Sequence, residues 1–419
     1  MRTLHADGLT ADDEVLARGF LESVARGYHQ GRTDDETVEA WLRWIREEAA
    51  VLRGGWLPDG AFGAGPMPVA TYLSFDRTLN AGSARLPVRM ITEVSVSPAH
   101  RRQGWLRRMI TADLDDAVAQ GVPVAALTAT EATIYGRFGF APATRVQHIE
   151  VDTGTRFALR DFTDTGRVEL VEPRTAWPAV QEVFGRFHSV TPGSVDRPAI
   201  FGPVLRGELN FTVNQHRDRL RTAVHLDATD TPDGYAVYRL ETTATGQEYV
   251  VVVTELVAPE ASAHLALWQF LAGIDLVTSV RMRRARFDDP LRWALQDLSC
   301  YRTTGIADHI WLRVLDVPLV LGSRLWAADG AVVLGVEDSL GHAAGTWALH
   351  VTDGRATVVP TDSAATVSLT AETLATLSLG GVRVGELASA GRLSGVPDAI
   401  ARLAAMSDGV PTPHSVVTF

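Results

Sequence analysis

The spacing of apolar residues changes along the chain, and the stretch from Glu93 to Phe140 shows the changes most clearly. Val94 and Val96 alternate with polar neighbours, which predicts a strand that Pro98 ends. The spacing then becomes that of a helix ending near Gly121, with one apolar face made by Leu106, Met109, Ile110, Leu114, Ala117 and Val118. Residues 122–127 predict a second strand. This stretch therefore predicts a strand–loop–helix–strand unit.

The remaining patterns predict two further units. Residues 1–53 indicate helices, residues 155–300 indicate a second α/β unit, and short strands with glycine turns follow from about residue 305. A chain of 419 residues is too long for one core. We therefore expect an α/β (α+β) protein with domains at 1–153, 154–303 and 304–419.

The loop Arg101-Arg102-Gln103-Gly104 stands where the predicted strand turns into the predicted helix. Main-chain N–H groups at a helix start carry partial positive charge and suit a pyrophosphate. Gly104 allows a close approach of the ligand to the backbone, and the arginines supply countercharge. The loop therefore predicts an anion site.

The sequence of this stretch resembles that of a known family. Arg101-Arg102-Gln103-Gly104-Trp105-Leu106 is similar to the coenzyme A loop of GNAT acetyltransferases, with Leu106 where a small residue is usual, and Tyr135 opens the Tyr-x-x-x-Gly-Phe ending of such domains. Ser97 to Gly104 and Ile134 to Phe140 resemble the Eis (enhanced intracellular survival) family. The resemblance implies tandem GNAT-like domains, the second degenerate and without cofactor, followed by a sterol-carrier-like α+β domain with a catalytic C-terminus.

The resemblance also implies an activity, a co-substrate and an assembly. We expect an acetyl-CoA-dependent N-acetyltransferase acting on polycationic small molecules such as aminoglycosides, at several amino groups. The implied cofactor-binding residues are Val94, Ser95, Val96, Arg101, Arg102, Gln103, Gly104, Trp105, Leu106, Arg107, Thr130 and Glu131. Eis relatives form hexamers, and Trp177, Trp268 and Trp311 offer aromatic surface either for such an interface or for a core.

Tyr135 is the candidate general acid. A phenol with a pKa near ~10 stays protonated at neutral pH and can protonate a departing thiolate. The alternative is a core aromatic residue. Glu131 could act as a base, or it could only complement a helix dipole.

Two further candidates concern the acceptor amine. A tryptophan at the position of Trp41 touches substrate in Eis relatives, whereas its helical spacing here equally indicates a core residue. Glu93 stands where close relatives carry an aromatic residue, and Thr418 stands where an acidic one is known. We expect Trp41 and Glu93 to bind the substrate.

The last residues also carry a prediction. Pro411 and Pro413 stiffen the tail, and residues 415–419 indicate a docked strand. In Eis relatives the carboxylate of a terminal phenylalanine is the general base. We therefore assign Phe419 as the base that works opposite Tyr135.

The composition of the chain limits the classes of molecule that it is expected to bind. The net charge of −11 favours cationic partners over nucleic acid, and no lysine is present. Arg281, Arg283, Arg284 and Arg286 are interpreted as a solvated strand edge. The apolar sequence context of the single cysteine, Cys300, indicates a core residue. The twelve histidines show no metal-ligand spacing, and no membrane-spanning run occurs, so we expect a cytoplasmic protein without metal.

Two alternatives remain open from the sequence. The acceptor could be a protein lysine. The chain could instead be an apolar-ligand-binding protein whose transferase domain is vestigial. The loop at Arg101 to Gly104, together with Tyr135, favours the enzyme.

Overall fold

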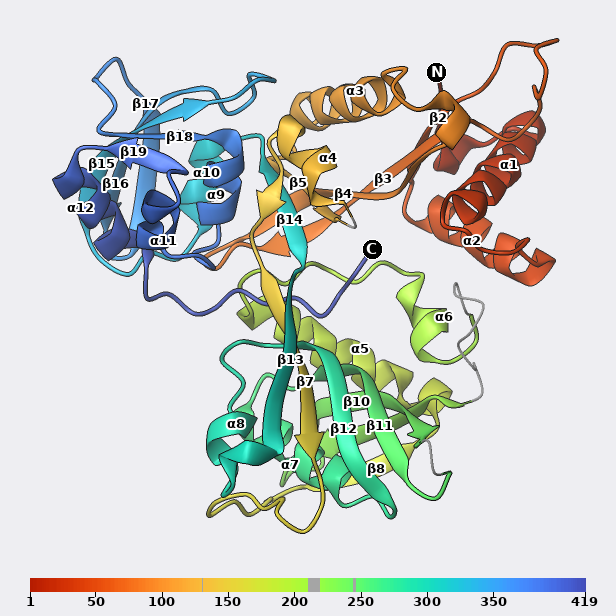
Figure 1. The fold of residues 1–419 in the computed structure, drawn as a ribbon, viewed down its shortest axis with the longest axis vertical. Helices are drawn as coiled ribbons and strands as arrows, with labels where there is room; N and C mark the ends of the chain where they lie inside the picture. Colours follow the sequence, from red (N-terminus) through yellow and green to blue (C-terminus); the bar gives the residue numbers. More distant parts are fainter. Residues whose placement is uncertain (130, 210–218, 244–245) are drawn as a thin grey trace.

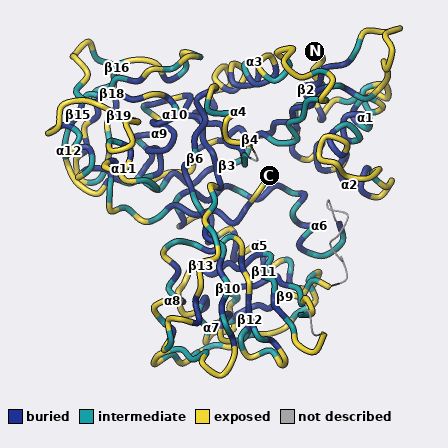
Figure 2. Tube along the Cα trace, viewed as in Figure 1, coloured by how far each residue is buried: buried dark blue, intermediate teal, exposed yellow. Residues whose placement is uncertain are grey.

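A computed structural model describes residues 1–129, 131–209, 219–243 and 246–419 (Figure 1). Three sheets organise these residues, and the end of the chain lies between them. Strand interiors are buried and connecting segments are exposed (Figure 2), as expected when each sheet is covered by helices.

The first sheet gathers strands from both ends of the first three-quarters of the chain. Its order is β1 (Arg2–His5), β2 (Val51–Gly55), β3 (Ala70–Asn80), β4 (Arg85–Val96), β5 (Val124–Thr128), β14 (Ile310–Val314) and β6 (Ala141–Pro142). The pair β4–β5 is parallel, and its crossover is the helix α3 (Trp105–Ala119). The predicted strand–loop–helix–strand unit is therefore confirmed.

Helices at the start of the chain pack beside this sheet. They are α1 (Ala11–Gly27) and α2 (Asp35–Glu47), with the short turns η1 (Ala6–Gly8) and η2 (Pro98–His100); α4 (Ala132–Tyr135) and η3 (Gly136–Phe138) follow β5. Thr10 and Asp13 form a capping box at the start of α1, and Asp34 caps α2 through the N–H of Thr37. The predicted helices are confirmed, whereas β1 and β2 were not predicted.

The second sheet belongs to the middle of the chain. Its order is β13 (Tyr301–Asp308), β7 (Arg145–Asp152), β12 (Val277–Ala285), β11 (Tyr249–Val257), β10 (Pro232–Thr242), β9 (Arg221–Leu226) and β8 (Arg167–Val171). Its helices are α5 (Pro173–Val190), α6 (Phe201–Leu205), α7 (Ala261–Ala272) and α8 (Leu291–Ala294), with η5 (Leu298–Cys300) before β13. The parallel pair β11–β12 and its crossover helix α7 repeat the arrangement of β4, α3 and β5.

The third sheet has the order β17 (Arg355–Pro360), β16 (Gly345–Thr352), β15 (Gly330–Glu337), β18 (Val367–Thr370) and β19 (Leu393–Gly395). Its helices are α9 (Val317–Ser323), α10 (Ala371–Leu377), α11 (Val384–Ser389) and α12 (Pro397–Ser407). The buried Arg313 on β14 donates to Asp338 Oδ2 over 2.5 Å, which ties this domain to the first sheet.

Two strands cross the predicted domain boundaries. β7, expected in the first domain, pairs with β12 and β13 in the second sheet, and β14, expected in the third, pairs with β5 and β6 in the first. These two strands join sheets across the predicted boundaries at 153 and 303, and the boundaries themselves stay a prediction. β14 covers what would otherwise be an open edge of β5.

Some interpretations of single residues also change. The arginine-rich segment 281–286 is no edge, because β12 lies between β7 and β11, and Arg284 turns inward. Trp268 and Trp311 are buried in cores, so they offer no surface for an interface; the hexamer stays a prediction. Cys300 is buried as predicted.

Candidate active site

The strands β4 and β5 separate towards the end of β4. Over the described residues their parallel ladder runs from Val88 opposite Val124 to Ile91 opposite Leu127. β4 continues to Val96, while β5 pairs on its other side with β14 as far as Thr128 opposite Ile310. The main-chain groups of Val94, Ser95 and Val96 that face β5 therefore lie outside this ladder. We call this region the strand divergence.

A β-bulge lies at the start of the divergence. Thr71 pairs with Ser95 and Leu73 with Thr92, so two residues of β4 oppose one residue of β3. Glu93 has a φ of 52°, a left-handed conformation that costs a non-glycine residue roughly 1–2 kcal/mol. The Thr71 hydroxyl donates to the Glu93 carbonyl oxygen over 2.8 Å, which helps to hold the bulge.

The bulge directs the Glu93 side chain towards α1 and α2. The indole Nε1 of Trp41 donates to Glu93 Oε1 over 2.8 Å. The other carboxylate oxygen, Oε2, is buried and has no hydrogen-bond partner in the described chain. Burial raises the pKa of Glu93 to about 7, and the bond from Trp41 opposes part of that rise. Glu93 therefore changes charge near neutral pH.

Trp41 itself is a core residue. Its side chain is fully buried and stacks on Phe20, with ring centroids 6.2 Å apart. Its contact with the divergence is the bond to Glu93, so its direct effect there is to position that carboxylate.

The loop before α3 has the backbone that an anion site needs. Arg102 and Gly104 adopt left-handed φ angles of 63° and 77°. Gly104 is the N-cap of α3, no side chain caps the helix start, and no acid lies in its first turn. Its first N–H groups are therefore available to a ligand.

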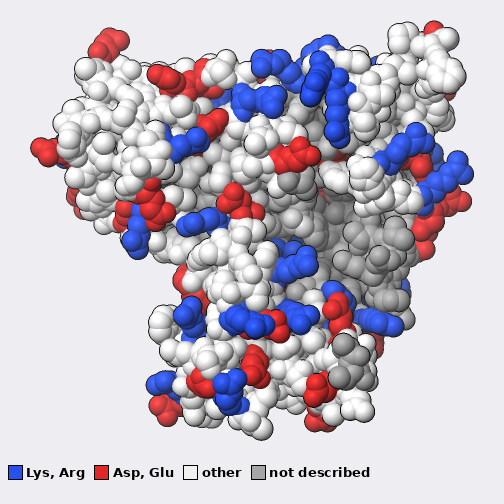
Figure 3. All heavy atoms as spheres, viewed as in Figure 1, with Lys and Arg blue, Asp and Glu red and all other residues white. Residues whose placement is uncertain are grey.

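Arginine side chains surround this helix start. Arg101, Arg102, Arg107 and Arg108 are exposed, and Figure 3 shows basic side chains gathered over α3. Arg108 stacks on Trp105 at 4.4 Å, and Gln103 accepts a bond of 3.3 Å from the indole of Trp105. A Cβ at Gly55 would lie 2.7 Å from Trp105, so this indole packs closely on β2 and leaves the arginine heads outside.

Tyr135 ends α4, beside the divergence. It is half-buried and meets Phe140 edge to face, with centroids 6.3 Å apart. Burial raises the pKa of its phenol, and Tyr28 and Glu131 raise it further, so the phenol stays protonated at neutral pH. Leu106 is half-buried in the same hydrophobic cluster as Tyr135.

The predicted neighbours of Tyr135 differ in what the structure says of them. Glu131 is exposed at the N-cap position of α4 and makes no side-chain cap bond. Thr130 lies outside the described residues. Gly139 has a φ of 81°, and a Cβ there would lie 2.6 Å from the guanidinium of Arg313, so both backbone and space require glycine in this motif.

The tail brings Phe419 to the end of β5. The hydroxyl of Thr128 donates a short hydrogen bond to a main-chain oxygen of Phe419. Val416 and Val417 are buried in the largest hydrophobic cluster, together with Ile310 and Leu312. Docking of the tail is thus confirmed, but the predicted strand at 415–419 is wrong, because these residues form no ladder in the described chain.

Two histidines fasten the tail before it reaches the divergence. The His414 N–H bonds the Pro192 carbonyl over 2.8 Å, and its ring lies edge-on to Phe187. The His309 ring is hydrogen-bonded to the main chain of Val417. Burial lowers the pKa of both imidazoles to about 3, so both are neutral.

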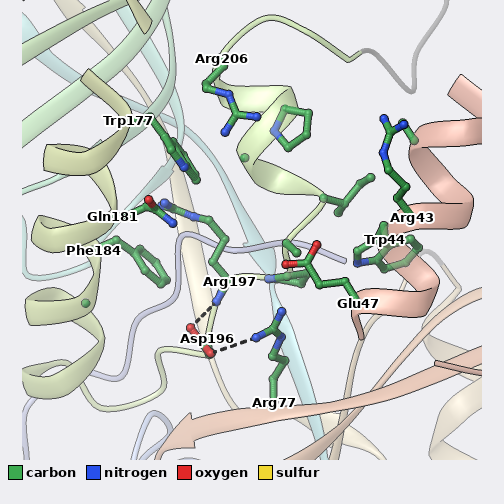
Figure 4. A pocket seen from close by; sticks show the side chains of 17 residues that line it. Arg43, Trp44, Glu47, Arg77, Trp177, Gln181, Phe184, Asp196, Arg197 and Arg206 are labelled. Carbon is green, nitrogen blue, oxygen red and sulfur yellow. Dashed lines mark hydrogen bonds and ion pairs between the residues drawn. The ribbon is translucent and has the colours of Figure 1, made fainter. Parts of the chain in front are cut away.

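A cavity of about 550 Å³ lies elsewhere, between α2, α5 and α6 (Figure 4). Two of its arginines are paired with acids: Arg197 with Glu255, and Arg77 with Glu48. Trp177 lines this cavity, whereas none of the candidate catalytic, cofactor-binding or substrate-binding residues does so in the described chain. We interpret this cavity as a seam between the first two domains.

Sequence reasoning missed two residues at this site. Thr128 holds Phe419, and Tyr28, at the end of α1, has its pKa raised by burial and by the charge of Glu93. Neither residue belongs to a motif, and only the folded chain brings them here. The described residues contain no cluster suited to a metal ion, and none of their helices is long and apolar enough to cross a bilayer.

Comparison with known proteins gives matches along the whole chain. Models of the acetyltransferase (GNAT) domain match residues 16–143 and 193–314, and a sterol carrier protein domain matches residues 317–415. The chain is 35% identical over 369 residues to N-acetyltransferase Eis of Mycobacterium tuberculosis (strain ATCC 25177 / H37Ra), which covers 85% of this chain and 86% of the relative. An uncharacterized N-acetyltransferase of Streptomyces griseus is 36% identical over 341 residues, with 80% and 82% covered.

Solved structures agree in architecture. Eis1 from Mycobacterium abscessus superposes with a TM-score of 0.82 at 25% identity and full coverage of both chains. A GCN5-related N-acetyltransferase from Kribbella flavida, at 21% identity and a TM-score of 0.74, shares the fold. The predicted order of two GNAT-type domains and a sterol-carrier-type domain is confirmed.

Proposed function

We propose, from the premise that this chain belongs to the Eis family of GNAT N-acetyltransferases, that it transfers the acetyl group of acetyl-CoA to amines of polycationic small molecules such as aminoglycosides. One observation carries the proposal. The divergence of β4 from β5, the uncapped start of α3, Tyr135 and the end of the chain at Thr128 all belong to one end of the first sheet.

The residues of the divergence fit acetyl-CoA. The free main-chain groups of Val94 to Val96 offer a strand edge to the amides of the pantetheine arm. The helix start at Gly104, with Arg101, Arg102 and Arg107 around it, offers charge and N–H groups to the phosphates. Acetyl-CoA, when bound, supplies the acetyl thioester; every other function at the site falls to main-chain and side-chain groups of the chain itself.

Tyr135 and Phe419 are proposed as the acid and the base. Because its pKa is raised, the phenol of Tyr135 holds its proton until a thiolate leaves. The terminal carboxylate of Phe419, held by Thr128, receives a proton from the attacking nitrogen.

A cationic acceptor suits the charges of the chain. The net charge of −11 attracts ammonium groups in general, and Glu93, in the bulge beside the divergence, holds a buried carboxylate oxygen without a hydrogen-bond partner in the described chain. A polyamine could meet this oxygen with one ammonium group while another reacts, which would give modification at several positions.

The test begins with binding and ends with products. Calorimetry should show that acetyl-CoA binds, and a thiol assay should show coenzyme A release that depends on an aminoglycoside. Mass spectrometry should then find more than one added acetyl group. Turnover on a peptide lysine but on no aminoglycoside would favour the protein-acetylating alternative.

The remaining alternatives give different outcomes. Binding of an apolar ligand without any acetyl-CoA binding would favour the vestigial-transferase alternative. Assembly as a hexamer is a separate proposal from the family relationship, and light scattering at micromolar concentration would contradict it by finding a monomer.

A further inference from the structure

We infer that Glu93 is a catalytic residue, whose Oε2 takes the first of the two protons that the acceptor nitrogen loses in each turnover. This inference rests on the proposed function and assigns a specific step to a residue that the proposal above uses only for binding. A simple binding role would need the charge of Glu93; a catalytic role also needs it to accept and release a proton.

The first support is the unusual isolation of the carboxylate. Among the buried polar atoms without a partner in the described chain, Glu93 Oε2 is the one carboxylate oxygen. Other buried acids are neutralised: Asp113 bonds Arg53 and Arg89, and Glu255 bonds Arg197. An unpaired buried carboxylate is costly, so natural folds keep one where a ligand completes it.

The backbone supplies a second, independent observation. Glu93 occupies the bulge of β4 with a left-handed φ, at the point where the ladder to β5 ends. This conformation is unfavourable for a glutamate. Backbone strain of this kind persists only where the surrounding structure enforces it, and such residues cluster at functional sites. The bond from Trp41 fixes Oε1 and leaves Oε2 as the free oxygen.

The groups around Glu93 leave it without a basic partner. The indole of Trp41 from α2 donates a hydrogen bond to Glu93, and the charge of Glu93 raises the pKa of Tyr28 at the end of α1. Tyr28 and Glu131 in turn raise the pKa of Tyr135 on α4. Among the described residues, burial and the bond from Trp41 are the influences on the pKa of Glu93, and no arginine is among them. The missing counterpart of Oε2 is therefore a cation, which the ammonium form of the acceptor amine supplies.

The raised pKa of Glu93 makes it a better proton acceptor than an ordinary carboxylate. Burial raises its pKa from 4.5 to about 7, so transfer from an aliphatic ammonium becomes roughly 300-fold less unfavourable. A group with a pKa near the working pH can also return its proton to water between turnovers.

The proton balance requires two acceptors. An ammonium R–NH₃⁺ gives its first proton to Glu93 and becomes the neutral amine. The nitrogen forms the C–N bond to the acetyl carbon and passes its second proton to the Phe419 carboxylate, while the C–S bond breaks and the sulfur takes the proton of Tyr135. One of the two protons taken from nitrogen then returns to Tyr135, and the other leaves to water. The products are the amide, coenzyme A and one released proton.

The experiment compares the wild type with Glu93→Gln on primary amines whose own pKa values run from about 6 to about 10. Glutamine keeps the size and the bond from Trp41 but cannot take a proton. At pH 7 we expect kcat/KM to fall about 100-fold for the most basic amines and less than about 3-fold for amines already neutral. Raising the pH should restore activity on basic amines in the variant.

Controls separate a chemical role from a structural one. Glu47→Gln, an exposed acid on the helix that carries Trp41, should keep wild-type rates. Acetyl-CoA affinity should match in all three proteins, and the melting temperature of Glu93→Gln should be no lower than that of the wild type, because the substitution removes a buried unpaired charge. Equal losses for all amines, or an unchanged pH profile, would overturn the inference while leaving the proposed function in place. Absence of any acetyl transfer by the wild type would instead remove the proposed function, and the inference with it.

Discussion

The first and second domains share one arrangement but differ at the point where chemistry would occur. Each has a parallel strand pair with a crossover helix: β4, α3 and β5 in the first, and β11, α7 and β12 in the second. In the second pair the ladder ends at Val253 opposite Met282, and Arg284 then donates to the Thr254 carbonyl over 2.7 Å. In the second domain an arginine side chain thus fills the place just beyond the end of the parallel ladder. The corresponding place in the first domain is the strand divergence.

The two crossover helices also differ in how well their first turns suit an anionic ligand. α3 begins at Gly104 with exposed arginines and no acid, whereas α7 begins after Pro259 with Glu260 at the N-cap. A carboxylate there complements the helix dipole and repels a pyrophosphate. A shared topology alone does not determine a shared activity, since a few positions decide whether the strand pair can take a ligand. The second domain instead supports the tail that reaches the first.

The largest expected effect concerns the stability of the second domain. Arg197→Met breaks the buried pair with Glu255 and should lower the unfolding free energy by about 3–5 kcal/mol, because Glu255 stays buried without its main partner. Acetyl-CoA affinity of the folded fraction should not change. Arg167→Met, which breaks exposed pairs in the same domain, should leave the unfolding free energy nearly unchanged by chemical denaturation.

The next effect is a loss of stability at low pH that arises from the two histidines at the docked tail. His309 and His414 have a pKa of about 3 when folded, against about 6.5 when unfolded. The unfolded or undocked state therefore binds protons more strongly, so stability is complete above about pH 6.5 and falls as the pH drops towards 3. At pH 5 we expect a loss of about 2 kcal/mol for each imidazole.

Denaturation curves at pH 7 and pH 5 would measure this loss. His414→Gln, which removes one titrating group, should reduce the loss between pH 7 and pH 5 by about 2 kcal/mol. An unchanged difference would show that His414 does not contribute to the acid sensitivity.

Tyr135→Phe tests the first domain through its rate. We expect kcat to fall about 100-fold or more, a usual contribution of a general acid, with acetyl-CoA affinity little changed. Tyr235→Phe provides the comparison from the second domain: its hydroxyl bonds Arg197 and Glu255, so its loss should lower stability but not kcat. Wild-type turnover of a folded Tyr135→Phe protein would return Tyr135 to a core role.

The smallest effect concerns the helix start. Gly104→Val puts a branched side chain at a φ of 77° and should weaken acetyl-CoA binding about 10-fold by calorimetry. Gly121→Val is the matched control, because Gly121 has a φ of 74°, has open space around it and lies beyond the other end of α3. If both variants bind equally well, the loop at Gly104 is not the phosphate site.

Local patterns predicted local structure. The change of apolar spacing around Gly104 predicted β4, α3 and β5, and the motif that Tyr135 opens contains Gly139, a glycine that the structure requires. Such features depend on neighbours in the sequence, so they can be found without a fold.

Contacts between distant segments could not be predicted. β14 joins β5 and β6 from about 180 residues away in the chain, by main-chain bonds that leave no sequence signal. Arg284 looked like its exposed neighbours, although its side chain turns inward. The left-handed φ of Glu93 and its free oxygen arise from packing among β3, α1 and α2, which no local pattern encodes.

The central claim is that the end of the chain, carried by the third domain, completes the site of the first. Appending two glycines after Phe419 tests it most directly, because every side chain stays and only the terminal charge moves away from Thr128. We predict a fall in kcat of at least about 100-fold, with unchanged acetyl-CoA affinity and melting temperature. An extended protein as active as the wild type would contradict the claim and would leave Glu93 and Glu131 as the candidate bases.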